Sequence, residues 1–149
     1  ACIVPVMGEY TEKSSVYALE GNKKERLERI IKEARQQSGS PVDTKILPPV
    51  SLSGAVEEWE KVSSENGDKV AFVLSERDDC KDNLKKILSE NKNIKHLAIA
   101  VGSEGGISPQ EVLLLEEKGL FHPIHFAVNI LRCETAALYG IAAIQSAIN

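Results

Sequence analysis

A glycine-rich loop runs from an apolar stretch into a predicted helix between Gly102 and Ser108. Its glycines, Gly102, Gly105 and Gly106, permit positive φ and let a ligand approach the backbone closely. Backbone N–H groups in such a turn can bind an anion or the polar edge of a ligand. The loop lacks the Gly-Lys-Ser/Thr ending of a P-loop and the spacing of GxGxxG. By its glycines alone, it is as consistent with a plain strand-to-helix turn as with a ligand site.

A second segment, from Phe126 to Leu138, places an arginine and a glutamate at the start of a predicted helix. The guanidinium of Arg132 matches planar pairs of oxygen atoms. Glu134 falls in the first helical turn, where the helix dipole favours an acid. Taken alone, this segment is better explained by a surface ion pair between Arg132 and Glu134 than by catalysis.

Both segments follow apolar stretches that are predicted to be strands. Strands are expected over Ile3–Met7, Lys45–Val50, Lys69–Leu74, His96–Val101 and His122–Val128, and helices over 22–38, 52–63, 81–89, 109–118 and 133–148. The third and fourth strands are apolar on both faces, which is typical of a parallel sheet covered by helices on both sides. The predicted fold class is therefore α/β, with a mostly parallel sheet. Such sheets bind ligands at the carboxyl ends of their strands, which is where both segments lie.

The predicted helix over 109–118 has marked end signals. Ser108 is an N-cap residue, Pro109 follows at the first helical position, and Glu111 completes a capping box. At the other end, Gly119 is expected to close the helix in the left-handed conformation.

Composition limits the class of protein. The chain has 149 residues, enough for one domain, and 42% of them are hydrophobic. No apolar run is long enough to span a membrane. The cysteines, Cys2, Cys80 and Cys133, show no metal-ligand or disulfide spacing, which favours a cytoplasmic protein without a metal. The net charge of −4 argues against a free-standing nucleic-acid binder, so RNA would have to be held by a local basic face or a separate domain.

Together and in this order, the two segments resemble the C-terminal signature of the knotted, SPOUT-class RNA methyltransferases. Within that class they are similar to the family that methylates N3 of a uridine in 16S, small-subunit ribosomal RNA. The family's Gly-Pro-Glu-Gly-Gly-hydrophobic-Ser motif matches Gly102–Ser108, with Ser103 in place of proline. Its hydrophobic-Leu-Arg-x-Glu-Thr-Ala-Ala block matches Ile130–Ala137. Upstream, Ile3–Val6 and Ala34–Gly39 resemble further family segments, so the likeness extends over the whole chain.

The resemblance implies S-adenosylmethionine as the cofactor, bound in a pocket within a C-terminal trefoil knot. The pocket is expected to use a loop at the third strand's end, Leu74–Glu76, together with the two segments. The residues expected to bind the cofactor are Leu74, Gly102, Glu104, Gly105, Gly106, Ile107, Phe126, Ile130, Leu131, Cys133 and Ala136. Apolar side chains would form a slot for adenine, and backbone groups would make the polar contacts.

The resemblance also implies roles at the substrate. Arg132 is expected to be catalytic, by stabilising negative charge on the uracil, or to bind the RNA phosphate. Arg35 and Gln37 are expected to contact RNA, although Ser40 stands where the family often has an arginine. The six Lys and Arg residues of the helix over 22–38 add a basic character that is either a solvated face or an RNA contact.

Two further expectations concern assembly. The family forms a homodimer through its last helix, and the helix over 133–148 is apolar enough for such an interface. Family members begin with a small PUA-like β-barrel that binds RNA, followed by a strand and a helix. Residues 1–149 are expected to form the SPOUT-type methyltransferase domain without those parts.

Two other classes of function stay open on the residues alone. A nucleotide- or dinucleotide-binding module would place the Gly102–Gly106 loop on phosphate, but no basic residue lies beside that loop. A catalytically silent dimerisation module would use the apolar last helix and bind no cofactor.

Overall fold

The computed structural model describes residues 1–12, 14, 19, 22–62, 68–75, 83–91 and 93–148. The chain divides into two compact units. Unit 1 comprises Ala1–Met7 and Thr11–Ala55, and unit 2 comprises Gly8–Tyr10 and Val56–Asn149. The predicted pocket residue Glu76 lies outside the described residues.

Unit 1 contains two pairs of short parallel strands. The first pair is β1 (Cys2–Ile3) with β3 (Lys45–Ile46), and the second is β2 (Val6–Met7) with β4 (Val50–Ser51). The two strands that the sequence predicts over this region are therefore each split in two.

Prolines explain both breaks. Pro5 separates β1 from β2, and Pro48 with Pro49 separates β3 from β4. Proline has no N–H to donate to a strand ladder, so neither strand can continue through its proline. The carbonyl of Pro5 still accepts a hydrogen bond from the Val50 N–H at 3.0 Å, which keeps the two segments of the chain side by side.

A long helix, α2, carries most of the charge of unit 1. It extends over Asn22–Ser38, as predicted. Gly39 follows with φ of 63°, a left-handed conformation that commonly ends helices. Leu27 and Ile31 on its apolar stripe are only half-buried, and Ile30 is 46% exposed.

Unit 2 contains a three-stranded parallel sheet. Its order is β6 (Ile94–Ala100), β5 (Asp68–Leu74) and β7 (Phe121–Ile124). The prediction that the last strand continues to Val128 is wrong. The Ile124 carbonyl accepts the last ladder bond, from Ser75 N–H at 2.9 Å, and the Val128 N–H then turns back to the Phe126 carbonyl at 2.7 Å.

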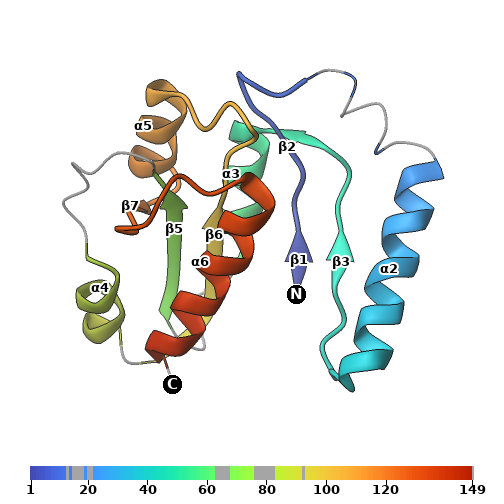
Figure 1. Ribbon diagram of the computed structural model, residues 1–149. Helices are drawn as coiled ribbons and strands as arrows, with labels where there is room; N and C mark the ends of the chain where they lie inside the picture. The colour runs from blue at the N-terminus through green and yellow to red at the C-terminus, as the bar shows by residue number, and fades with distance from the viewer. Residues whose placement is uncertain are drawn as a thin grey trace. The chain divides into compact units, whose positions relative to one another are not determined.

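Helices cover both faces of this sheet. On one face, Phe72 of β5 packs in a buried cluster with Ile87 of α4 (Leu84–Glu90) and Ile144 of α6 (Cys133–Ile148). Figure 1 shows α6 running in front of β5 and β6. On the other face, the Phe121 ring meets Trp59 edge-on at a centroid distance of 6.2 Å. Trp59 belongs to α3 (Leu52–Glu60), and α5 (Pro109–Glu117) also packs against β7. The predicted α/β class with parallel strands is thus confirmed.

A glycine lets α6 approach the sheet closely. A Cβ added to Gly140 would lie 2.6 Å from Ile99 Cδ1 and 3.1 Å from Leu74 Cδ1. A larger residue at this position would force the ends of the Ile99 and Leu74 side chains to shift. The same contact packs the middle of α6 against the end of β5 at Leu74.

The ends of α5 agree with the prediction at one side only. Ser108 and Glu111 form the expected capping box, and Pro109 is the first helical residue. The left-handed residue at the other end is Leu120, with φ of 53°, and not Gly119. Gly119 is needed for space instead, because a Cβ there would lie 2.7 Å from the Phe121 ring.

Candidate functional site

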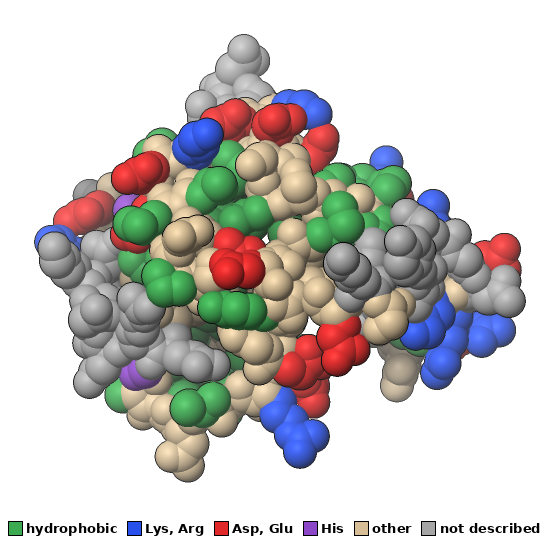
Figure 2. Space-filling view, turned by 90° about the horizontal axis from the view of Figure 1, so that it is seen from above, with side chains coloured by type: hydrophobic (Ala, Val, Ile, Leu, Met, Phe, Trp, Pro, Cys, Tyr) green, Lys and Arg blue, Asp and Glu red, His purple; other side chains and the backbone are tan. Residues whose placement is uncertain are grey.

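A pocket of about 540 Å³ lies at the carboxyl end of the unit 2 sheet. Its walls come from the end of β5, the glycine loop after β6 and the segment between β7 and α6. The lining includes Arg132 and all but one of the predicted cofactor residues, namely Leu74, Gly102, Glu104, Gly106, Ile107, Phe126, Ile130, Leu131, Cys133 and Ala136. Two segments about thirty residues apart in sequence therefore form one site. Figure 2 shows hydrophobic and acidic side chains near the centre of its view, with Lys and Arg towards the margin.

The glycine loop is a tight turn. The Gly106 N–H donates to the Ser103 carbonyl at 2.9 Å, and these two residues form an isolated antiparallel bridge. A Cβ at Gly102 would lie 2.6 Å from the carbonyl carbon of Gly106, so no side chain fits there. Gly106 has φ of 78°, where a residue with a side chain is strained. Both glycines are thus required by the turn that forms one pocket wall.

Gly105 is the predicted cofactor residue that does not line the pocket. A Cβ at this position would lie 2.7 Å from the Cβ of Tyr10. The Ser103 hydroxyl also donates to the Tyr10 carbonyl at 3.4 Å. Gly105 therefore lies against the segment Gly8–Tyr10, on a part of the turn that the pocket does not include.

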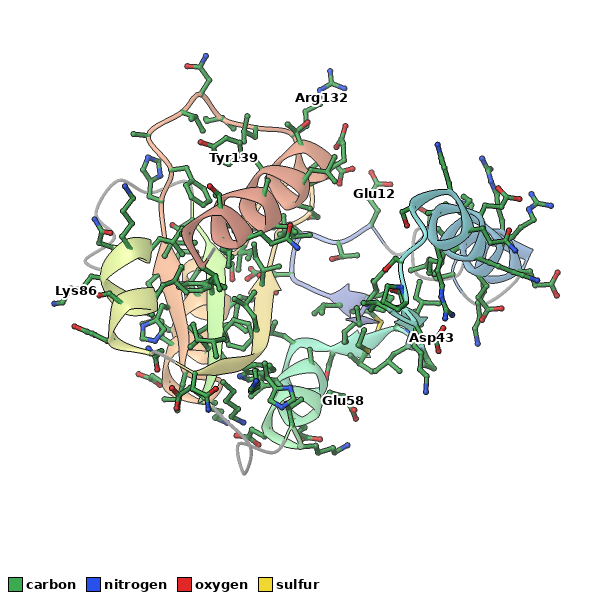
Figure 3. All side chains as sticks on the ribbon, turned by 90° about the horizontal axis from the view of Figure 1, so that it is seen from below. Glu12, Asp43, Glu58, Lys86, Arg132 and Tyr139 are labelled. Carbon is green, nitrogen blue, oxygen red and sulfur yellow. The ribbon has the colours of Figure 1, made fainter. Side chains whose placement is uncertain are left out.

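The wall opposite the turn is largely apolar. Phe126 lines the pocket, and its ring is supported by Tyr139 of α6 in an edge-on contact with a centroid distance of 5.0 Å. In Figure 3 the Tyr139 side chain points from α6 towards the loop that precedes the helix. Ile130 also lines the pocket but is 80% exposed. Its side chain is therefore largely unpacked against the protein and is available to cover a ligand.

Three consecutive residues at the start of α6 carry the polar chemistry. Figure 3 shows the Arg132 side chain extending outward from this end of the helix. The Cys133 thiol donates to the Glu134 carboxylate at 3.2 Å. That hydrogen bond raises the pKa of the Cys133 thiol, with smaller contributions from burial and Glu104. The pKa of Glu134 is lowered by its own backbone N–H at the helix start, by the Cys133 thiol and by the Arg132 charge. Glu134 is therefore held as an anion and is a weakened proton acceptor.

The two remaining predicted substrate residues, Arg35 and Gln37, lie in unit 1, on the last turns of α2. The Arg35 guanidinium donates to Asp43 Oδ1 at 3.1 Å, to the Ser40 carbonyl at 3.3 Å and to the Pro41 carbonyl at 3.4 Å. These contacts hold the turn that follows α2, so an RNA phosphate would have to share or replace them. Gln37 is exposed.

One pocket residue, His125, was missed from the sequence, while Ser75 belongs to the predicted loop Leu74–Glu76. Ser75 and His125 both line the pocket, and the His125 Nδ1 lies 3.1 Å from the Ser75 carbonyl. A carbonyl only accepts, so this contact places the proton on Nδ1 when the ring is neutral. Both residues immediately follow strands whose carboxyl ends meet at this edge, and that rule could have identified His125.

The lining suits a nucleoside with a short charged tail. The volume falls within the range of about 300–1,000 Å³ typical of small-molecule sites. Leu74, Ile107 and Leu131 supply an apolar wall for a flat ring, and the Gly102–Gly106 turn presents backbone groups to its polar edge. Glu104 and Glu134 add negative charge to the lining, which suits a ligand carrying ammonium or sulfonium charge. S-adenosylmethionine has all of these features.

Other ligand classes find less support among the described residues. Within that part of the chain, no group of three or more His, Cys, Asp or Glu side chains is placed to hold a metal ion. None of its helices is both long enough and apolar enough to cross a membrane.

Known proteins similar to this chain point to one family. A family model of RNA methyltransferase domains matches residues 1–145. The Ribosomal RNA small subunit methyltransferase E of Aquifex aeolicus is 33% identical over 135 residues, which cover 91% of this chain and 52% of that protein. The Ribosomal RNA small subunit methyltransferase E 2 of Borreliella burgdorferi is 39% identical over 59 residues, covering 38% of this chain and 24% of that protein.

A solved structure extends the likeness to three dimensions. The Ribosomal RNA small subunit methyltransferase E of Neisseria gonorrhoeae, bound to S-adenosyl methionine, matches with a TM-score of 0.72 and 28% identity. The match covers 98% of this chain and 54% of that one. The chain thus spans about half the length of the Aquifex and Neisseria proteins. Both segments that carried the resemblance, Gly102–Ser108 and Ile130–Ala137, fall within the family match. The chain belongs to the RNA methyltransferase domain family, as its two C-terminal segments predict.

Proposed function

We propose that the unit 2 pocket binds S-adenosylmethionine, and that the protein methylates N3 of a uridine in small-subunit ribosomal RNA. The observation that carries this proposal is the pocket itself. A tight glycine turn and an Ile-Leu-Arg segment, distant in sequence, form one apolar cleft with acidic residues at its rim. A relative of similar fold is known with this cofactor bound. A phosphate-binding module is not favoured, because Glu104 is the charged residue of the turn and it would repel phosphate.

The chemistry requires a proton to leave the substrate. When bound, S-adenosylmethionine supplies an electrophilic methyl group on its sulfonium. The uracil N3–H bond is replaced by an N3–CH₃ bond, so the N3 proton must pass to a base. Until the methyl group is transferred, the ring carries negative charge on the two oxygens beside N3. A guanidinium beside that ring stabilises the charge where it develops.

Arg132 is the residue proposed for this role. It lines the pocket, extends from the helix start and is exposed, so it can reach a base presented from solvent. The fork of N–H donors on a guanidinium matches two oxygens in one plane. Glu134 is proposed as its positioning neighbour and not as the base, because its pKa is lowered and it is already an acceptor for the Cys133 thiol.

RNA binding is proposed for unit 1. Its residues include eight Lys and Arg against six Asp and Glu, whereas unit 2 has ten against sixteen. Phosphate contacts require local positive charge. Exposed basic side chains along α2 can supply it, namely Lys23, Lys24, Arg26, Arg29 and Lys32, together with the predicted contacts Arg35 and Gln37.

We also propose that α6 forms a homodimer interface. Leu138 is 72% exposed, Ile141 45% and Ile148 49%, which leaves an apolar stripe along α6 beside the buried Ile144. Exposed apolar stripes of this kind are typical of subunit contacts. Sedimentation of the purified chain would give the mass of a dimer, and a Leu138→Lys/Ile141→Lys variant would give that of a monomer.

Calorimetry with S-adenosylmethionine tests the cofactor proposal. The chain is expected to bind it with a Kd of roughly micromolar order. Gly102→Ala forces the turn apart and is expected to weaken binding by about tenfold or more, the effect of roughly 1.4 kcal/mol. Gly39→Ala, at the left-handed glycine of unit 1, is the matched control and should leave the Kd unchanged. Equal or tighter binding of ATP or NAD would contradict the proposal.

The substrate proposal needs RNA. Small-subunit RNA from cells lacking the modification, incubated with the whole protein and cofactor, is expected to gain 3-methyluridine by mass spectrometry. Arg132→Ala should reduce the rate by about two orders of magnitude, as removal of a charge-stabilising donor typically does. Methylation at another uridine atom would refute the N3 assignment alone.

A further inference from the structure

Glu111 of α5 makes hydrogen bonds in two directions. Its Oε2 accepts from the Ser108 N–H at 2.9 Å, and its own N–H donates to the Ser108 hydroxyl at 3.2 Å. These two bonds are the capping box of α5. Its other carboxylate oxygen, Oε1, accepts from the N–H of Glu9 at 2.7 Å, across 102 residues of sequence. One carboxylate thus joins the helix that follows the glycine turn to the segment Gly8–Tyr10.

That segment also supports the turn directly. The Tyr10 carbonyl accepts from the Ser103 hydroxyl at 3.4 Å, and Gly105 lies so close to the Tyr10 Cβ that a side chain could not be added. Gly8–Tyr10 therefore meets the turn at Ser103 and Gly105 and meets the helix after it at Glu111. Of these residues only Ser103 also lines the pocket.

We infer that Gly8–Tyr10 braces the cofactor-binding turn, and that Glu111 is a positioning residue for the cofactor although it does not touch the pocket. The inference rests on the proposed function, because it takes the pocket to be the S-adenosylmethionine site. The turn needs such support, since its glycines have more backbone freedom to lose than any other residue. Holding it in one shape from behind lowers the entropy that the ligand must otherwise remove on binding.

Both oxygens of the carboxylate are needed for the brace. Glutamate offers an acceptor to Ser108 and a second acceptor to Glu9 at the same time. Glutamine keeps one acceptor, and at the third helical position it still completes a capping box. Its amide NH₂ would then face the Glu9 N–H, donor against donor. Glu111→Gln therefore separates the cap, which it retains, from the brace, which it loses.

The experiment compares Glu111→Gln with Leu115→Ala, by calorimetry with S-adenosylmethionine and by thermal unfolding. Leu115 lies on the same helix, is 2% exposed and does not line the pocket, so its truncation destabilises the fold without touching brace or site. Glu111→Gln is expected to keep its Tm within about 2 °C of wild type, since the cap persists, and to weaken cofactor binding about five- to tenfold, the effect of one charge-assisted hydrogen bond. Leu115→Ala is expected to lower Tm by several degrees and leave the Kd within about twofold.

Hydrogen exchange gives a second measurement on the same proteins. The Glu9 amide should be protected in the wild type and exchange faster in Glu111→Gln, with the Ser108 amide unchanged. Unchanged Kd together with unprotected Glu9 in the wild type, or a Kd that follows Tm equally in both variants, would overturn the inference. If the wild type binds no S-adenosylmethionine while Glu9 is protected by Glu111, the cofactor proposal fails and the brace itself stands.

Discussion

Units 1 and 2 are built from the same alternation of parallel strands and helices, yet they bury very different amounts of apolar surface. In unit 2 the strand residues Phe72 and Val73 are completely buried, and helices cover both faces of the sheet. Among the described residues of unit 1 none is buried, and its strands are two residues long. The two units also differ in charge. Unit 1 has an excess of basic residues, and unit 2 has an excess of acidic residues.

This difference matches the two tasks that we propose for the units. A densely packed unit with a preformed pocket can hold a small cofactor at fixed geometry. A polar, basic and exposed helix is suited to contact a large polyanion, where affinity comes from charge and not from shape. The comparison predicts that mutations in unit 2 act on stability and cofactor binding, whereas mutations in unit 1 act on RNA binding.

The largest expected effect is on stability. Phe72→Ala removes a side chain with 0% exposure from unit 2 and should lower the free energy of unfolding by about 3–5 kcal/mol. Ile30→Ala removes a 46% exposed side chain from unit 1 and should cost less than about 1 kcal/mol. Urea unfolding followed by far-UV circular dichroism, which reports the helices of both units, measures both. Equal losses for the two variants would erase the contrast between the units.

The next effect is on RNA affinity. Lys23→Glu/Arg26→Glu reverses two charges on α2 and should weaken binding of small-subunit RNA about tenfold or more at low salt, with a shallower salt dependence. Lys85→Glu/Lys86→Glu makes the same change on α4 of unit 2 and should alter the RNA Kd by less than about twofold. Filter binding over a salt series measures both. If the α4 variant lost as much affinity, RNA binding could not be assigned to unit 1.

The smallest effect is on thiol reactivity. The Glu134 carboxylate raises the pKa of the Cys133 thiol, so less thiolate is present at pH 8 than in an isolated cysteine. Glu134→Gln should shift the pH midpoint for alkylation of Cys133 downward and speed its reaction with iodoacetamide at pH 8. Peptide mass spectrometry resolves Cys133 from Cys2 in unit 1, whose rate should not change. An unchanged Cys133 midpoint would show that the hydrogen bond does not persist in solution.

Local patterns predicted much of the fold correctly. The capping box of Ser108 and Glu111, the bounds of α2 and the parallel strands are all found, because each depends on neighbouring residues. The predictions were wrong where a tertiary contact determined the local conformation. Gly119 was predicted to be left-handed, but the space beside the Phe121 ring selects glycine there and Leu120 takes the positive φ.

The candidate site was predictable for a similar reason, and its support was not. The two segments that line the pocket each carry a recognisable motif, and the carboxyl ends of parallel strands bring them to one edge. Nothing in the pattern around Glu9 or Tyr10 indicates that this segment meets the glycine turn. The hydrogen bond from Glu9 to Glu111 joins residues that are 102 positions apart, and sequence periodicity describes only neighbouring residues.

That same bond sets an order of events during synthesis. At roughly 5–20 residues per second, a ribosome makes Glu9 about 5–20 seconds before the carboxylate that will receive it, 102 residues later. The nascent chain must carry Gly8–Tyr10 unmatched until Glu111 has been made, so the cofactor cavity cannot mature before that point. Slowing elongation after residue 56 would lengthen this immature period without changing the finished protein.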